Sequence, residues 1–447
     1  MWCPTINISD FTILLNLLSA EYSKISNKCC LKAIMSVKVY KSQIDNFILV
    51  VILTIIGFYN SLAFIKTQEY IFHHFSATGD IIFSISFINA LSFLFRPLGG
   101  TIRSLFQHRI KKPLLPYFVL VYAFYNIAVI NFVGYFPINY AIITLIFNCV
   151  LIGILLGAIY PEAIVRILDK DRLSPARKVF VGNCYFIAVY FGAAFTKLTL
   201  ADVNNPVYKV IISLMPLIFC IFALYFYLQT SRDISNTKEK MILYEAASSM
   251  VCIQNNFWTI IRFTCFLTFV TSLNAFFSTV MPFYLVRYLN YSESSVFNLQ
   301  VVIFLFSIAG LVLGAIFHQK LGRRLHIVLG LLIKIILYFL FKAYIKNDYI
   351  QILIFESICM LFVGLMLSKI LTVLDSIFEV KYKFGSISII YNLTFGFFSG
   401  LGVFLSTYLI SKSGNLYIPS IIIITFSYLS LVSLWFTPNK DFFRYTK

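Results

Sequence analysis

The stretch FRPLGGTIRSLFQHRIKK, Phe95 to Lys112, shows how the rest of the chain is organised. It begins as the end of a long apolar run, contains the small residues Gly99, Gly100 and Ser104, and ends in a cluster of positive charge. A comparable stretch, LVLGAIFHQKLGRRLH, spans Leu311 to His326, after the corresponding apolar run of the second half. Two copies of one segment in two apolar halves predict an internally repeated membrane transporter.

The composition excludes a soluble fold. The 447 residues are 60% hydrophobic and 12% charged, with a mean hydropathy of +0.87, whereas soluble domains carry roughly 25% charged residues. The net charge of +18 forms no basic stripe or arm, so nucleic acid is not an expected partner. The nine cysteines are scattered without a CxxC pair, so neither a disulfide framework nor a metal site is expected, and no cofactor is expected either.

Apolar runs long enough to span a bilayer, about 20 residues each, recur along the chain. They lie at 46–65, 80–100, 114–134, 138–160, 178–199, 207–229, 257–284, 296–317, 325–345, 350–374, 386–410 and 416–437. The pattern predicts an all-α membrane protein with twelve transmembrane helices in two six-helix halves. The predicted parts are an N-terminal extension (1–45), a first bundle (46–229), a cytoplasmic linker (230–256), a second bundle (257–437) and a tail (438–447).

The distribution of Lys and Arg predicts the orientation. The two termini and the even-numbered loops hold 25 of the 36 Lys and Arg residues, and the odd-numbered loops hold 7. Because cytoplasmic loops carry the excess of positive charge, both termini are expected in the cytoplasm. The expected location is the cell membrane, with the bacterial inner membrane as the specific prediction.

The first segment resembles the signature of the major facilitator superfamily, an RPLGG-like start followed by spaced glycines and Asp-Arg-x-Gly-Arg-Lys. Arg96 to Gly100 and Arg109 match it, whereas His108 and Gln319 stand where the two copies would carry aspartate. The resemblance implies a twelve-helix transporter with a cytoplasmic gate. Acidic partners of that gate are missing from both copies, so neutral hydrogen bonds would have to replace the charge pairing.

A second resemblance is to the metabolite–proton symporter branch, the proline/betaine transporters. FRPLGG carries it together with LDSIFEVKYKFGSISIIYNLTFGFFSGLG, Leu374 to Gly402. This likeness implies an amino acid or a betaine-like osmolyte as the substrate. In that branch helix 1 has a Glu and an Asp close together, whereas this chain has Gly57 and Asn60 there. The substitution weakens the case for proton coupling.

Several polar residues within the apolar runs are candidates for substrate binding, since such groups are costly in the bilayer. They could present hydroxyls and amides to a cavity, although each one alone is more often an interhelical hydrogen bond. These candidates are Tyr59, Asn60, Asn274, Tyr391 and Asn392.

Glu356 is the best remaining carboxylate for a proton or a cationic substrate, because it lies about six residues, roughly 9 Å, into its run. The alternative is a carboxylate paired in the outer vestibule. Lys334, near the middle of the preceding run, could reach towards Glu356, or it could extend its ammonium group towards the membrane surface.

The predicted cytoplasmic gate draws on both repeated segments and on the end of the fourth run. Glu162 and Arg166 are four residues apart on one helix face and form either a structural ion pair or a gate contact. Simple retention of positive charge on the cytoplasmic side is the alternative for the individual cations. The predicted gate residues are Arg96, Gly100, Arg109, Lys112, Glu162, Arg166, Lys320 and Arg323.

These observations predict a secondary transporter that moves a small polar metabolite by alternating access, with or without proton symport, and that works as a monomer. No GxxxxGK[ST] phosphate loop is present in the sequence. The alternatives are a gradient-independent facilitator or exchanger, and a degenerate paralogue that inserts without transporting. A polytopic membrane enzyme is disfavoured, because the longest loop has no acidic or His-rich catalytic constellation.

Overall fold

The computed structural model describes residues 47–48, 50–57, 90–109, 117–122, 124, 138–168, 175–199, 214, 217–225, 228, 249–320, 322–414, 417–438 and 441. Residues 50–447 form one compact unit, and residues 1–49 form another, of which only 47 and 48 are described. All labelled helices belong to the larger unit. Tyr59, Asn60 and Lys112 lie outside the described residues.

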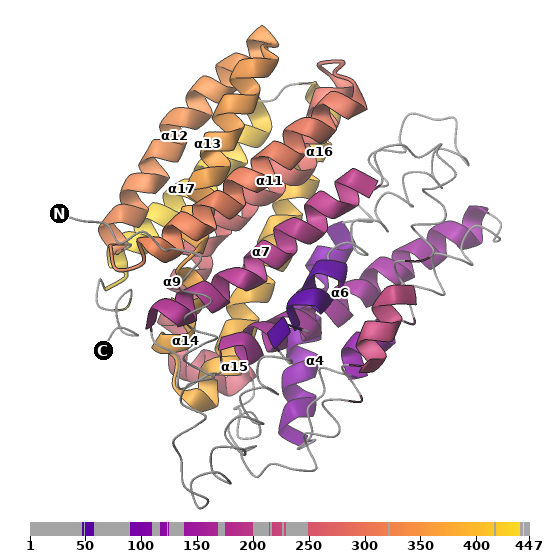
Figure 1. Ribbon diagram of the computed structural model, residues 1–447, viewed down its shortest axis with the longest axis vertical. Helices are drawn as coiled ribbons and strands as arrows, with labels where there is room; N and C mark the ends of the chain where they lie inside the picture. The colour runs from indigo at the N-terminus through magenta and orange to yellow at the C-terminus, as the bar shows by residue number, and fades with distance from the viewer. Residues whose placement is uncertain are drawn as a thin grey trace, which may run out of the picture. The chain divides into compact units, whose positions relative to one another are not determined.

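The regular structure of the described ranges is helical (Figure 1). In the first half the labelled helices are α4 (Arg96–Arg109), α6 (Ile138–Leu168) and α7 (Pro175–Thr199), and residues 50–57, 90–94, 117–122 and 217–225 are also helical. The second half contains α9 (Ser249–Ala275), α10 (Met281–Arg287), α11 (Glu293–Ile316), α12 (Arg323–Lys346), α13 (Tyr349–Leu367), α14 (Ile370–Ile377), α15 (Val380–Tyr391), α16 (Ser399–Ser413) and α17 (Tyr417–Phe436), with two π-helical segments, η3 (Phe276–Val280) and η4 (Asn392–Phe398).

Within the described part, seven segments are long and apolar enough to cross a membrane. They cover 146–165, 177–196, 250–287, 293–316, 323–346, 349–377 and 380–413, and a shorter apolar helix follows at 421–436. Each corresponds to one of the predicted runs. The runs at 46–65, 80–100, 114–134 and 207–229 are described only in part.

Helix ends in the second half follow from local sequence. The Ser292 hydroxyl accepts a hydrogen bond from the Ser295 amide (3.2 Å) at the start of α11, and the Asp348 carboxylate accepts one from the Gln351 amide (3.1 Å) at the start of α13. These side chains satisfy amides that a first helical turn leaves without partners. Gly414 ends α16 at a φ of 63°, which a residue without Cβ adopts easily.

The two repeated segments differ in structure. The first is helical from Arg96 to Arg109, so α4 continues beyond the predicted end of its run at residue 100. The second leaves the helix after Ile316 and turns before α12 begins at Arg323. The expected cytoplasmic turn therefore starts later in the first copy than in the second. The physical reason is an ion pair that Arg103 makes within the bundle, described below.

Each half is held together by a close helix crossing. A Cβ added to Gly157 of α6 would lie 2.0 Å from the Arg96 carbonyl oxygen of α4, and one added to Gly364 of α13 would lie 2.2 Å from the Ser307 carbonyl oxygen of α11. Real Cβ atoms do not approach so closely, so glycine is needed at both crossings. Small residues thus allow close helix approach in both halves.

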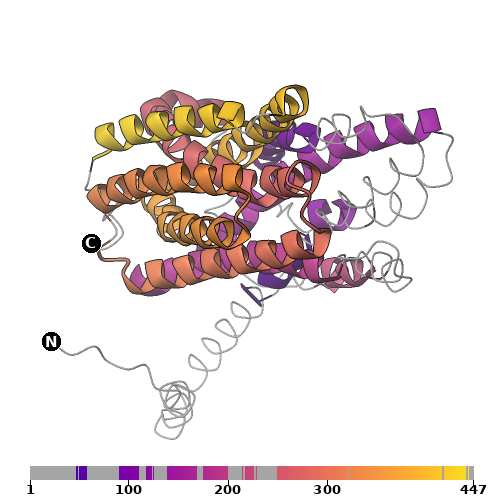
Figure 2. The same ribbon diagram turned by 90° about the horizontal axis from the view of Figure 1, so that it is seen from above.

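The halves meet in a reciprocal way. In the first half α4 contacts α15 and η4 of the second, while α11 of the second half contacts α7 of the first. Both views show α7 running beside α11 (Figures 1 and 2). The second helix of each half therefore packs against the fifth helix of the other, as two related bundles facing each other would do.

Candidate substrate site and gate

A cluster of buried tyrosines lies where the halves meet. The hydroxyl oxygens of Tyr185 on α7 and Tyr391 on α15 are 2.7 Å apart and share a hydrogen bond. The Tyr160 ring on α6 contacts both edge-on, with centroid distances of 6.4 and 6.2 Å. By helix rise Tyr160 and Tyr185 are about 12 and 15 Å inside the nearest ends of α6 and α7, and Tyr391 is about 16 Å from the start of the segment 380–413. The structure thus places the predicted Tyr391 at the contact between the halves.

Amide side chains extend this contact. Asn392 donates from Nδ2 to the Gly157 carbonyl (2.9 Å), and the Asn274 Oδ1 accepts from the Tyr190 hydroxyl (3.1 Å). Both bonds join one half to the other. Three of the five predicted substrate residues, Tyr391, Asn392 and Asn274, therefore lie where the two halves are in contact.

Arg96 lies in the same region, about 20 Å from the C-terminal end of α4 by helix rise. Its side chain is 6% exposed, and Nη1 donates to the Phe395 carbonyl of η4 at 3.2 Å. Its Cζ is 4.3 Å from the Phe93 ring centroid and 5.8 Å from that of Tyr160. The sequence placed Arg96 in the predicted gate, and the structure shows it in contact with Phe93, Tyr160 and the Phe395 carbonyl.

Glu356 is fully buried on α13 and accepts a short hydrogen bond from the Tyr344 hydroxyl of α12. Its Oε2 has no hydrogen-bond partner among the described residues. Lys334 does not reach it: its Nζ lies 3.7 Å from the ring centroid of Tyr428, an exposed residue of α17. Glu356 is thus a carboxyl group paired with a hydroxyl inside the second bundle.

Glu162 has a partner that the sequence did not indicate. Arg103 of α4 donates from Nε to the Glu162 Oε2 at 2.6 Å, with Nη2 at 2.5 Å, and both side chains are at most 1% exposed. The Arg103 Cζ also lies 5.4 Å from the Phe384 ring centroid of α15. The side chain of Arg166 is outside the described residues. The Glu162 pair described here joins α4 to α6 and touches the other half.

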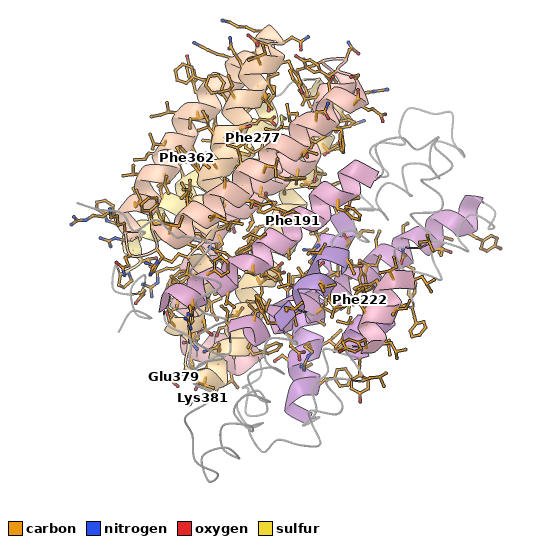
Figure 3. All side chains as sticks on the ribbon, viewed as in Figure 1. Phe191, Phe222, Phe277, Phe362, Glu379 and Lys381 are labelled. Carbon is orange, nitrogen blue, oxygen red and sulfur yellow. The ribbon has the colours of Figure 1, made fainter. Side chains whose placement is uncertain are left out.

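A second charged group bridges the halves. The Asp375 carboxylate on α14 lies 2.8 Å from Lys383 Nζ on α15 and 3.7 Å from Lys178 Nζ on α7. Asp375 is 5% exposed. Its neighbours Glu379 and Lys381, labelled in Figure 3, form an exposed pair 3.9 Å apart. Asp375 is thus an acidic residue close to the predicted gate. It lies outside the two repeated segments and was therefore not among the predicted gate residues.

The remaining predicted gate residues have varied surroundings. Gly100 faces the second half, because a Cβ there would lie 2.4 Å from the Asn392 Nδ2. Arg323 donates to the Trp435 and Thr437 carbonyls (3.2 and 3.0 Å) at the end of α17, in its own half. Lys320 is exposed, with Nζ 5.8 Å from the Phe317 ring centroid. Arg109 ends α4, and its side chain is outside the described residues.

The residues that sequence reasoning missed are Arg103, Asp375, Lys178 and the tyrosines at 160, 185 and 190. With 28 Tyr and 48 Phe in the chain, no single aromatic stood out. Arg103 and Asp375 did carry a signal, since each is an ionisable residue at the edge of an apolar run.

Comparison with protein-family models and with curated proteins finds no match for this sequence. Solved structures do match. The major facilitator superfamily proton:xylose symporter XylE, bound to 6-bromo-6-deoxy-D-glucose, aligns with a TM-score of 0.66 at 12% identity, covering 90% of this chain and 97% of that one. The xylose transporter XylE from E. coli aligns in a partially occluded inward-open conformation with a TM-score of 0.65 at 14% identity, covering 89% and 98%.

The inward-open conformation of the same E. coli transporter gives a TM-score of 0.63 at 13% identity, covering 89% of this chain and 96% of that one. The alignment spans both bundles, and at this identity the likeness concerns the fold. The predicted all-α architecture of two six-helix halves is confirmed. This chain therefore has the fold of the major facilitator superfamily.

Proposed function

We propose that the protein is a secondary transporter that moves a small polar metabolite across the cell membrane by alternating access. The observation that carries the proposal is the polar contact between the two halves. Single hydrogen bonds such as Tyr185–Tyr391 and Asn392–Gly157 join the halves, and each contributes only about 0.5–1.5 kcal/mol. Two bundles joined by such contacts can part on one side and close on the other.

The proposed substrate is an amino acid or a betaine-like osmolyte, as the resemblance of FRPLGG and the Leu374–Gly402 stretch to proline/betaine transporters suggests. XylE, with the same fold, is a xylose symporter, so a sugar belongs in any test. The protein works as a monomer in the bacterial inner membrane with both termini in the cytoplasm. This orientation follows from the Lys and Arg distribution.

Proton coupling, where it operates, is assigned to Glu356. Three carboxylates are buried in the described part: Glu162, Glu356 and Asp375. Glu162 faces Arg103 and Asp375 faces two lysines, so these two charges are balanced. Glu356 faces the Tyr344 hydroxyl. A carboxyl group buried beside a hydroxyl is a place where a proton can be held and released.

The gate on the predicted cytoplasmic side combines Lys178, Asp375 and Lys383 with Arg103 and Glu162. Lys178 and Asp375 belong to different halves, so opening this side must separate them. The two repeated segments lack the aspartates that would pair with cations at the gate. In this proposal Asp375 of α14 supplies that negative charge instead. Gly100 allows the close contact of α4 with the second half.

The test is uptake of labelled L-proline, glycine betaine and D-xylose by proteoliposomes, with and without an imposed pH gradient. Uptake of any of these three compounds above the level in protein-free vesicles supports transport. If none of them is taken up, transport of these substrate classes is rejected. Glu356→Gln should abolish stimulation by the gradient, while Glu379→Gln, at an exposed carboxylate, should leave it unchanged. Full gradient-driven uptake by Glu356→Gln would remove Glu356 from the coupling role.

A gradient-independent facilitator or exchanger is the second candidate. Gly57 and Asn60 stand where the proline/betaine transporters have their acidic pair. This substitution favours transport without proton coupling. Uptake that the pH gradient does not change would select it over symport.

A further inference from the structure

Arg96 is a buried cation in an unusual position. It lies within the helix bundle at the contact between the halves, and within the described part it forms no ion pair. Its Nε has no hydrogen-bond partner there either. A charged side chain placed so deep in a membrane protein is costly and is a default candidate for function. The Phe395 carbonyl alone does not balance its charge.

The backbone around Arg96 leaves room for this side chain. A Cβ at Gly396 of η4 would lie 3.0 Å from the Arg96 Cβ and 3.3 Å from its Cδ. The Phe395 carbonyl that accepts from Arg96 belongs to this π-helical segment, and π-helical turns are frequent at functional sites. Gly157, on the other side, brings α6 against the Arg96 backbone. Glycines from both halves therefore lie against the backbone and the aliphatic part of Arg96.

The groups around the guanidinium suit a small carboxylate with an apolar or cationic body. Phe93 and Tyr160 offer ring faces, and the Tyr185 and Tyr391 hydroxyls lie in the adjoining cluster. A guanidinium binds a carboxylate through two parallel hydrogen bonds, hydroxyls donate to its free lone pairs, and aromatic faces attract a quaternary or secondary ammonium group.

We propose that Arg96 binds the carboxylate of the transported substrate, which takes the place of the Phe395 carbonyl, and that Tyr160, Tyr185 and Tyr391 line the same site. This inference rests on the proposed transport function and narrows its substrate to carboxylate-bearing molecules. A phosphorylated substrate fits less well, because the other Arg and Lys side chains that are buried in the described part are engaged. Arg103 pairs with Glu162, and Lys369 donates to the His318 carbonyl at 2.9 Å.

The test is equilibrium binding to the purified protein in detergent with two matched pairs of probes. Glycine betaine is compared with choline, and L-proline with L-prolinamide, so that each pair differs in its carboxylate. The wild-type protein should prefer the carboxylate of at least one pair by roughly tenfold or more, as expected for a charge-assisted hydrogen bond. Arg96→Gln, which can still donate to Phe395, should lose this preference, and Arg96→Lys should keep part of it.

Arg262→Gln is the matched control, because Arg262 also donates from Nη1 to a carbonyl, that of Phe436 at 3.1 Å, but lies away from the tyrosine cluster. It should bind as the wild type does. Three outcomes would each overturn the site. In the first, Arg96→Gln keeps the wild-type preference for the carboxylate probe. In the second, the wild-type protein binds both members of each pair equally well, and in the third it binds neither glycine betaine nor L-proline. If Arg96→Gln does not fold, Arg96→Lys decides the question. A carboxylate preference weaker than that of the wild type supports the site, and an unweakened preference overturns it.

The outcomes separate this inference from transport itself. Carboxylate-selective binding without uptake in proteoliposomes would reject transport and keep the site. Uptake of D-xylose without carboxylate preference would keep transport and reject the site.

Discussion

The Arg103–Glu162 pair allows a quantitative prediction about stability. Both side chains are essentially unexposed and their charged atoms are 2.5 to 2.6 Å apart. At 2.6 Å and an effective dielectric constant of about 20, the Coulomb attraction is about 6 kcal/mol. Most of this attraction offsets the cost of removing two charges from water, so the pair as a whole adds little to stability. Removing one partner is different, because the other charge stays buried.

We therefore expect Glu162→Gln and Arg103→Met each to lower the free energy of unfolding by about 3–5 kcal/mol. The double variant should regain most of this loss, because neither of the two buried charges remains. It should stay slightly below the wild type, since the contact of Arg103 with the Phe384 ring, about 0.5–2 kcal/mol, is also lost. The two substitutions should thus be strongly non-additive.

The assay is denaturant unfolding of the four proteins in one detergent, analysed as a double-mutant cycle. The control cycle uses Lys381→Met and Glu379→Gln, an exposed pair 3.9 Å apart, which should show no measurable coupling. Single variants as stable as the wild type, or losses that simply add in the double variant, would refute the buried pairing.

Further predictions concern the crossings, the gate and the orientation. Gly157→Ala should lower the free energy of unfolding by about 1–3 kcal/mol, because its Cβ would meet the Arg96 carbonyl oxygen at 2.0 Å. Gly402→Ala is the control and should not destabilise the protein, because its Cβ would have its nearest contact at 3.7 Å. Thermal unfolding in detergent compares the two variants. Asp375→Asn frees Lys178 and Lys383 and should make a buried Ser388→Cys thiol react several-fold faster with a water-soluble maleimide, an effect that Glu379→Gln should lack. An equal rate in both backgrounds would count against the ionic gate. A reporter fused after Lys112 should read cytoplasmic, and the opposite reading would reverse the orientation.

The sequence by itself determined the architecture. Runs of about 20 apolar residues leave the bilayer as the only solvent for this chain, and the two copies of the glycine and basic segment predict two related halves. The reason is that helix spacing and charge distribution are local properties that do not depend on which helices touch. The same reasoning selected Glu356, Tyr391, Asn392 and Asn274, whose polarity stands out within apolar runs.

Tertiary structure decided the partners. The spacing of Glu162 and Arg166 suggested a pair, which stays a prediction because the Arg166 side chain lies outside the described residues. The structure adds a partner of Glu162 that spacing does not indicate, Arg103, 59 residues away. Arg96 looked like part of a loop signature, yet its guanidinium lies near the Tyr160 ring and donates to the Phe395 carbonyl of the other half. Asp375 forms an ion pair with Lys178 on another helix. Such contacts depend on how the bundles pack, because residues nearly 200 positions apart become neighbours only through that packing. The chain alone shows which groups are costly in the membrane, and only the fold shows which groups offset that cost.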